Sequence, residues 1–471
     1  MEIEEFRRHA HRMVDWMADY MANVEEYPVR AQTKPGEVAA RLPESPPVAA
    51  EPLDAVMADF ERDILPGITH WQHPRFFAYF PANNSPPSVL AEMLTATIGA
   101  QCMLWQTSPA GTELETRVTD WLRQMIGLPE GFHGVIQDSA SSAILCAVLT
   151  ARERATDWRA NEAGLAGGAP VVVYTSDQTH SATEKGAKVA GIGRENVRLI
   201  ETDPETFAMR PEALEAAILA DKAAGRLPAC LVANLGATGV GAMDDLEALG
   251  RIARAHGLFA HVDAAWAGSA LILEEHQHLL RGIEHFDSFV FNPHKWLMTN
   301  FDCSAHYVRK PEDLIRTLSI LPAFLQSREA GSVIDYRDWS VPLGRRFRAL
   351  KLWFVLRCYG VAGLQAIIRN HIAWAADLEA AIRAEPDFEI CAPRQLSLIN
   401  FRFAPAGADD LDAVNARLLE AINDDGFTYL TQNRVRGAFA FRFQIGQTMT
   451  TAQDVRDAWR RVVEIARRLA P

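Results

Sequence analysis

Short apolar runs alternate with segments of helical periodicity through the middle of the chain. The helical segments include 180–191, 211–225 and 245–257, and the second begins with Pro and ends with Gly, as many helices do. Strands that alternate with helices predict a mostly parallel sheet covered on both faces, hence an α/β fold. The expected strands are VVVYTSD (171–177), VRLIETD (197–203), CLVANLG (230–236), FAHVDAA (259–265), FDSFVFNPHK (286–295) and CSAHYV (303–308).

The N-terminal part has a different pattern. Residues 1–30 carry Phe6, Met13 and Met17 at roughly helical spacing, which predicts an amphipathic helix. The Pro- and Ala-rich stretch 31–52 indicates an extended connector, either a flexible linker or an arm wrapped over another surface.

The C-terminal part changes character again. Two long helical segments, 347–360 and 366–384, come before the alternating stretches LSLINFRF (396–403) and FAFRFQIG (439–446). A last helix closes the chain. This order predicts a smaller α+β domain with antiparallel strands.

Composition narrows the class of protein. A chain of 471 residues exceeds the usual size of one hydrophobic core, so we expect two or three domains. The net charge of −13 argues against nucleic acid and anionic membranes as main partners.

The N-terminus lacks the pattern of a secretory signal. There is no uncharged apolar run of about 18 residues, so we expect no membrane span. Six scattered cysteines without a CxxC pair fit a reducing cytoplasm.

Lys295 is the most unusual residue of the pattern. It stands in NPHKWLM (292–298), directly after the apolar run FDSFVF. Burial of a lysine is costly unless the amine is paired or used chemically. The residue is therefore a candidate for a chemical role.

Other candidates follow strands, where parallel sheets place their ligand sites. Ser139, Ala140 and Ser141 begin a helix and suit a phosphate group, although Ser is also a common helix cap. His180 follows VVVYTSD, where a histidine is more often a surface or cap residue. Thr238 lies in a Gly-rich segment that could be a simple turn.

Asp263 ends the strand FAHVDAA and is followed by small residues. A carboxylate there is either a helix cap or the partner of a buried cation. Each of these signals is weak alone, but together they fit pyridoxal phosphate. That cofactor needs a lysine for its Schiff base, a carboxylate for its ring nitrogen, a phosphate cradle and a flat side chain over the ring. A lysine held as a neutral imine costs less to bury.

The motifs resemble those of the group II pyridoxal-phosphate-dependent decarboxylases, above all the aromatic-L-amino-acid decarboxylases. The resemblance runs nearly end to end. The segments that carry it are SASS, SDQTH, HVDAAWAGS, FNPHKW, THWQHPRFFAYFP (69–81), SPAGTELE (108–115), NFDCSAHYV (300–308) and PLGRRFRALKLWFVLRCYGVAGLQ (342–365).

The resemblance implies a fold-type I enzyme with a mostly parallel seven-stranded sheet, acting as a carboxy-lyase. The division would be an N-terminal helical arm (1–85), a large cofactor-binding domain (86–350) and a small α+β domain (351–471). The family forms homodimers with active sites at the subunit interface, and its arm wraps the partner. This favours the wrapped-arm interpretation for residues 1–85.

The family's site residues can be carried over by position. Lys295 would hold the cofactor as a Schiff base, Asp263 would pair with the ring nitrogen, and His180 would stack on the ring. Thr238 would bond near the ring hydroxyl and Ala265 would pack beside the ring. The phosphate would be surrounded by Ser139, Ala140, Ser141, Asn292 and His294. The substrate pocket would include Trp71, Tyr79, Phe80 and Pro81.

The mobile loop departs from the family pattern. Relatives carry a tyrosine in a motif like P-x-Y-L, and this tyrosine is regarded as the acid that protonates the α-carbon after CO2 leaves. Here Phe324 stands at that place in SILPAFLQSREAG (319–331), and phenylalanine has no proton to give. In relatives with phenylalanine, oxygen reacts instead, and the products are an aldehyde, ammonia and hydrogen peroxide. Plain decarboxylation is our leading prediction, and this aldehyde synthase chemistry is the alternative.

The substrate pocket departs as well. Gln101 and Met103 replace more apolar or aromatic side chains of the animal enzymes, and Gly344 leaves room for a bulky ring. An aromatic L-amino acid is the expected substrate, without a ranking among tryptophan, tyrosine, DOPA and phenylalanine.

Three other functions fit the sequence less well. GIGREN (191–196) and GVGAMD (239–244) lack the third glycine of a nicotinamide-binding fingerprint. The histidines of EEHQH (274–278) lie on a charged stretch that indicates a solvated face, so we expect no metal. A non-catalytic binding protein on this scaffold would be expected to lose Lys295 or Asp263, and both are present.

Overall fold

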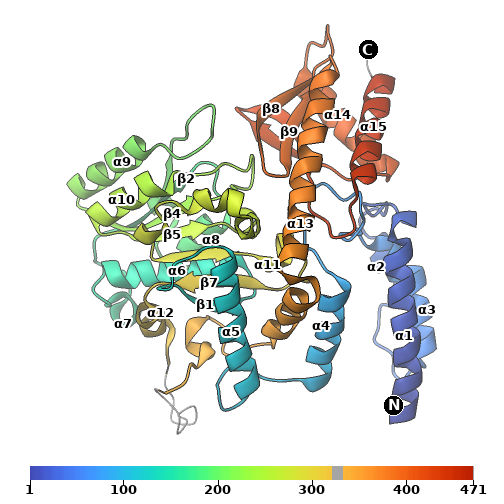
Figure 1. The fold of residues 1–471 in the computed structure, drawn as a ribbon, viewed down its shortest axis with the longest axis horizontal. Helices are drawn as coiled ribbons and strands as arrows, with labels where there is room; N and C mark the ends of the chain where they lie inside the picture. Colours follow the sequence, from blue (N-terminus) through green and yellow to red (C-terminus); the bar gives the residue numbers. More distant parts are fainter. Residues whose placement is uncertain (321–331, 470–471) are drawn as a thin grey trace.

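A seven-stranded sheet forms the centre of the larger part of the molecule in a computed structural model that describes residues 1–320 and 332–469 (Figure 1). Its order is β1-β7-β6-β5-β4-β2-β3. The strands from β3 to β6 pair in parallel, whereas β7 is antiparallel to both β6 and β1. This confirms the mostly parallel α/β fold. The strands are β1 (His133–Gln137), β2 (Val171–Ser176), β3 (Val197–Ile200), β4 (Leu227–Asn234), β5 (Phe259–Asp263), β6 (Ser288–Phe291) and β7 (Ser304–Val308).

Helices occupy the segments between the strands, as the alternating pattern predicts. In chain order they are α1 (Ile3–Asn23), α2 (Glu37–Arg41), α3 (Leu53–Asp59), α4 (Pro86–Ile98), α5 (Pro109–Met125), α6 (Ala140–Ala155), α7 (Ala160–Ala163), α8 (Ala182–Val189), α9 (Pro211–Ala223), α10 (Leu246–His256), α11 (Pro293–Trp296), α12 (Pro311–Leu318), α13 (Arg348–Ala384), α14 (Leu411–Asp425) and α15 (Ala452–Leu469).

One predicted strand is shorter than expected. The strand predicted over 286–295 ends at Phe291, and Pro293–Trp296 form the one-turn helix α11. Pro293 has no N–H for the sheet ladder, and its fixed φ suits the first position of a helix. Lys295 therefore lies on a helical turn at the end of β6, not on a strand.

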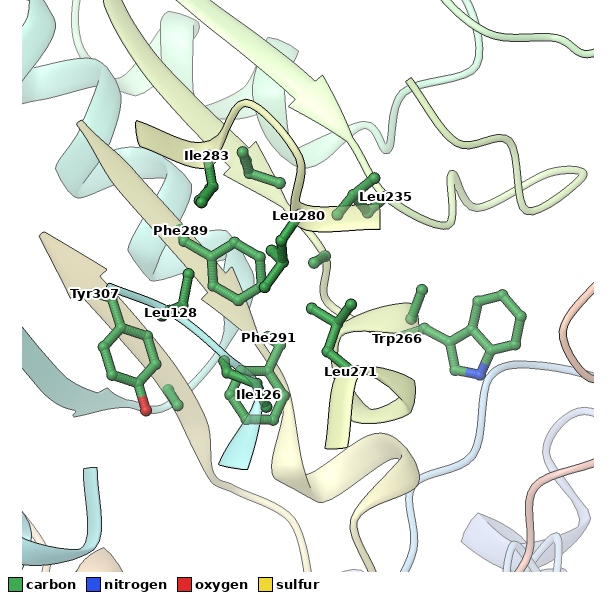
Figure 2. Packing of buried hydrophobic residues seen from close by; sticks show 14 of the residues in the cluster. Ile126, Leu128, Leu235, Trp266, Leu271, Leu280, Ile283, Phe289, Phe291 and Tyr307 are labelled. Carbon is green, nitrogen blue, oxygen red and sulfur yellow. The ribbon is translucent and has the colours of Figure 1, made fainter. Parts of the chain in front are cut away.

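The core lies between the sheet and its covering helices. On one face, Phe289 and Phe291 of β6 and Tyr307 of β7 pack against Ile126 and other apolar residues that follow α5 and β5 (Figure 2). On the other face, Ile144 and Val148 of α6 pack against Val173 and Val232. Apolar burial on both faces is the main stabilising term for such a sheet.

A four-stranded antiparallel sheet organises the C-terminal part, in the order β10-β11-β9-β8. Its apolar face packs on α14, α15 and the end of α13. This confirms the small α+β unit, while the exact division at residues 85 and 350 stays a prediction. The strands are β8 (Phe388–Gln395), β9 (Leu398–Phe403), β10 (Thr431–Val435) and β11 (Ala438–Gln444).

Helix α13 contains the two predicted helices of the C-terminal part, which follow each other directly across Gly360. It is kinked at Gly360, whose φ of 64° and ψ of 169° suit glycine. Among the described residues, α13 is the one helix that is long and apolar enough to cross a membrane, judged by length and composition only. Its buried apolar side chains belong to two cores, with Leu352 and Val355 in the large core and Leu378 in the small one. Core helices of globular proteins share this composition.

The N-terminal helices lie at one side of the molecule, where α1 and α3 run beside each other (Figure 1). Trp16 of α1 contacts Tyr20 and Phe60. The remaining surface of α1 is poorly covered, because Ile3 and Phe6 are exposed. The arm thus has apolar side chains that the other described residues leave exposed.

We predict that the protein loses stability as the pH falls below about 6.5. Burial lowers the pKa of His73, His294, His306 and His371 to about 3. The unfolded chain binds these protons near pH 6.5 and the folded chain does not, so acidification favours unfolding between the two values. Each such histidine adds a slope of about 1.4 kcal/mol per pH unit. Urea unfolding midpoints at several pH values measure the slope.

His306→Phe tests this account, because neither ring nitrogen of His306 has a hydrogen-bond partner in the described structure. The variant should keep its stability at pH 8 and unfold less readily at pH 5. The exposed His11→Gln is the control and should leave the slope unchanged. An unchanged slope in His306→Phe would contradict the prediction.

Candidate active site

A cavity of about 200 Å³ lies at the carboxyl ends of the central strands. Asp263 is the last residue of β5, Asn234 is the last of β4, and Asn292 follows β6. Parallel sheets place ligand sites at this edge. Every residue predicted to surround the cofactor lines this cavity: Ser139, Ala140, Ser141, His180, Thr238, Asp263, Ala265, Asn292, His294 and Lys295.

Lys295 is presented to the cavity by α11. Its ammonium nitrogen lies 5.1 Å from the centre of the Phe80 ring. Burial, opposed by Asp263 and assisted by Arg442, lowers the pKa of Lys295 to about 8. A larger share of the amine is therefore neutral near pH 7 than for an ordinary lysine, and the neutral amine is the nucleophile.

Asp263 is a buried carboxylate on the cavity wall. One of its oxygens accepts the N–H of Ala265 at 3.0 Å, which fixes the carboxylate at the end of β5. A fixed carboxylate can hold a pyridine nitrogen in its protonated form. The position fits the ring of pyridoxal phosphate.

The start of α6 forms another wall. Ser139 caps this helix, since its Oγ accepts the N–H of Ser142 at 3.2 Å. Ser139 is thus a helix cap, as one of the two interpretations predicted. A cap does not exclude a phosphate site, because the first N–H groups of any helix make no hydrogen bonds within the helix and can bind an anion. Ala140 and Ser141 present that first turn to the cavity.

His294 and Asn292 add neutral donors. Nδ1 of His294 accepts the N–H of Cys303 at 2.9 Å, and burial keeps the ring neutral, so its proton lies on Nε2. The Oδ1 of Asn292 accepts the Ser304 hydroxyl at 2.6 Å, which leaves its NH2 group as a donor. Donors of this kind suit a phosphate group.

His180 lies two residues before α8 and is exposed in the single chain. Its Nδ1 accepts the N–H of Ala182 at 3.1 Å, which fixes the ring on the cavity wall. Burial of the ring nitrogens lowers the pKa of His180, Lys295 lowers it further, and Asp263 opposes them. The ring is therefore mainly neutral at pH 7, as a stacking partner for another flat ring should be.

Arg442 was missed by the sequence analysis. It lies on β11, is 6% exposed, and its guanidinium carbon is 5.0 Å from the centre of the same Phe80 ring. Two of its nitrogens have no hydrogen-bond partner in the described part of the chain, and burial lowers its pKa to about 10. The sequence feature that could have identified Arg442 is its position between Phe441 and Phe443 in an apolar strand. An unpaired buried cation indicates an anionic ligand.

The predicted substrate residues divide into two groups. Phe80 lines the cavity, whereas Trp71 and Tyr79 do not line it and stack on each other with ring centres 5.6 Å apart. Pro81 is buried one residue further on. These residues come from the segment 71–81, which leads directly into the cavity wall.

Gln101, Met103 and Gly344 form the second group and do not line the cavity of their own chain. Gln101 Oε1 accepts the N–H of Arg345, the residue after Gly344, at 2.6 Å. The carbonyl of Met103 accepts the N–H of Arg337 at 3.0 Å. The three residues thus lie near one another at a different place. Phe324 lies outside the described residues.

Comparison with known proteins agrees with this geometry. The model of the pyridoxal-dependent decarboxylase conserved domain matches residues 35–404. A phenylacetaldehyde synthase of Arabidopsis thaliana is 44% identical over 99% of this chain and 96% of its own. A tyrosine decarboxylase of Petroselinum crispum is 44% identical over 98% of this chain and 93% of its own.

A solved structure gives the same result. The crystal structure of Catharanthus roseus tryptophan decarboxylase in complex with L-tryptophan is 42% identical, with a TM-score of 0.94 and coverage of 100% of this chain and 99% of that one. The match of fold, cavity and sequence over the whole length confirms the predicted resemblance. The chain belongs to the pyridoxal-dependent decarboxylase family and is an enzyme that uses pyridoxal phosphate.

Proposed function

We propose that the enzyme decarboxylates an aromatic L-amino acid to the corresponding arylalkylamine and CO2. The observation that carries this proposal is one cavity in which Lys295, Asp263 and the neutral donors of α6 and α11 face the same space. The relatives named above carry names that refer to aromatic compounds: tyrosine, tryptophan and phenylacetaldehyde.

Each wall of the cavity has a role in this reaction. Lys295 would bind the cofactor, Asp263 would hold its ring nitrogen, and the first turn of α6 with Asn292 and His294 would hold its phosphate. When bound, pyridoxal phosphate supplies an electron sink for the bond that breaks at the α-carbon. The protein's contribution is to hold the ring flat and to orient the substrate.

Arg442 provides the charge that the substrate carboxylate needs. A guanidinium with unused donors, buried beside Phe80, would attract and orient this group. Trp71, Tyr79 and Phe80 offer aromatic faces for the side chain of the substrate. Phe80, which lines the cavity, thus has the cationic Arg442 beside its ring and belongs to the same segment as the aromatic Trp71 and Tyr79.

We predict that Arg442→Gln raises KM for the amino acid about 10- to 100-fold, the range expected when a charge-assisted hydrogen bond is lost. Cofactor content, read from the visible absorbance band, should stay close to that of the natural protein. Arg434→Gln on the neighbouring strand is the control, because Arg434 is exposed and pairs with Asp412. An unchanged KM in Arg442→Gln would exclude this role.

We also propose that the enzyme is a homodimer whose second copy completes each site. Gln101, Met103 and Gly344 do not reach the cavity within one chain. Exposed apolar side chains lie on α4 and on two other segments: Leu90, Leu94, Ile98, Phe301, Val341 and Leu343. An apolar surface of this kind supports an interface between copies.

Leu94→Glu should therefore give a monomer with little activity, because a buried charge in the interface is costly. Leu94 is 46% exposed in the single chain. Size-exclusion chromatography with light scattering measures the mass. Leu219→Glu on α9, where the leucine is 54% exposed, is the matched control and should leave the mass unchanged. A fully dimeric Leu94→Glu protein would contradict this interface.

The product is decided by a turnover experiment. The purified, cofactor-loaded enzyme is supplied aerobically with several aromatic L-amino acids, and CO2, amine, aldehyde and peroxide are followed together. We predict amine without peroxide, which would mean that a group other than residue 324 gives the proton. Aldehyde with matching peroxide would establish the alternative, an aldehyde synthase, and Phe324→Tyr should then restore amine formation.

A cytoplasmic location is part of the same proposal. The six cysteines are free, and four of them are buried. Burial raises the pKa of Cys146 to about 12, which keeps this thiol protonated and unreactive. Free thiols of this kind suit a reducing compartment.

A further inference from the structure

Asn83 lies where three segments of the active site meet. It is 1% exposed and follows Phe80 by three residues. Its main-chain N–H donates to the carbonyl of His294 at 2.9 Å. The residue therefore touches the segment that carries Lys295 without lining the cavity itself.

The side-chain amide of Asn83 is fully used. Its NH2 group donates to the carbonyl of Lys295 at 2.9 Å and to the carbonyl of Gly446 at 2.6 Å. Its oxygen accepts the N–H of Thr448 at 2.8 Å and the Thr448 hydroxyl at 2.9 Å. An amide has two donors and two acceptor sites, so no capacity remains.

These bonds join Lys295 to Arg442 by a short path. Gly446 and Thr448 follow β11, the strand that carries Arg442. Lys295 and Arg442 lie at 5.1 Å and 5.0 Å from the same Phe80 ring, and Phe80 belongs to the segment that ends at Asn83. Asn83 thus connects the segments that carry Lys295, Phe80 and Arg442, which meet at the Phe80 ring.

A second bridge runs parallel to the first. Trp296, next to Lys295, donates its indole N–H to Nδ1 of His371 at 2.9 Å, and the rings are stacked. His371 in turn bonds the main chain of Gln447. The Lys295 segment is therefore held twice to residues 446–448, and Asn83 supplies the bridge that touches Lys295 directly.

We propose that Asn83 is a positioning residue that sets the spacing between Lys295 and Arg442, an inference that rests on the proposed roles of both residues. If the amide is removed, the carbonyl of Lys295 and the chain after β11 lose their common partner. Lys295 and Arg442 can then shift independently, and the cofactor and the substrate carboxylate are no longer held in matched positions.

The test compares Asn83→Ala with Asn415→Ala. Asn415 is also buried, and its amide bonds main-chain groups of Phe403 and Leu411, far along the chain from Lys295. Both variants should lower Tm. Asn83→Ala alone should lower kcat by about 10- to 100-fold, the effect typical of residues that orient a binding group. It should also move the pH midpoint of the visible cofactor band and weaken pyridoxal phosphate binding.

Thr448 gives a milder version of the test if Asn83→Ala does not fold. Thr448→Val removes the hydroxyl that contacts the Asn83 oxygen at 2.9 Å and the Asn84 carbonyl at 2.5 Å, and Thr448→Ser keeps it. The valine variant should shift the pH midpoint of the cofactor band, and the serine variant should restore it. A cofactor band and kcat in Asn83→Ala equal to those of Asn415→Ala would overturn the inference. A natural protein without any cofactor band would instead overturn the role of Lys295.

Discussion

The placement of two buried cations beside one aromatic ring is the constraint on which this active site depends. Lys295 and Arg442 both lie next to Phe80, and Asp263 is the carboxylate that acts on the pKa of the lysine. Each cation, left alone, would be costly to bury. Their presence is explained when the cavity receives ligands with a reactive carbonyl and a carboxylate, as pyridoxal phosphate and an amino acid provide. The fold around them supplies the walls and the donors.

The two cations come from different parts of the chain. Lys295 follows a strand of the large sheet, and Arg442 lies on a strand of the small one. A site built from two units needs connections that keep the units in register. The polar bridges through Asn83 and His371 are such connections, and both end in the three residues 446–448.

Much of this could be predicted from the sequence. The order of strands and helices was clear because a parallel sheet buries both faces and leaves continuous apolar runs. Asp263, Asn292 and Lys295 could be placed together because each follows a strand. The helical turn that begins at Pro293 was not predicted, because it has only four residues and directly follows the apolar run of a strand. Arg442 was missed because it lies inside a strand of another domain, where only the flanking phenylalanines mark its burial.

Other features depend on more than one chain or on contacts distant in sequence. Gln101, Met103 and Gly344 could be identified by family position, but no local pattern shows that they lie outside the cavity of their own chain. The bonds of Asn83 join residues more than two hundred positions apart. Contacts between residues so far apart produce no periodic pattern in the sequence, so they could not be predicted from it.

Helix α13 has a consequence for how the protein unfolds. Its buried residues up to Ile368 belong to the core of the large sheet, and those from Ala375 onward belong to the core of the small one. Neither core can lose its packing without exposing apolar residues of the shared helix. The two parts are therefore coupled thermodynamically, and the melting of one lowers the free energy of unfolding of the other.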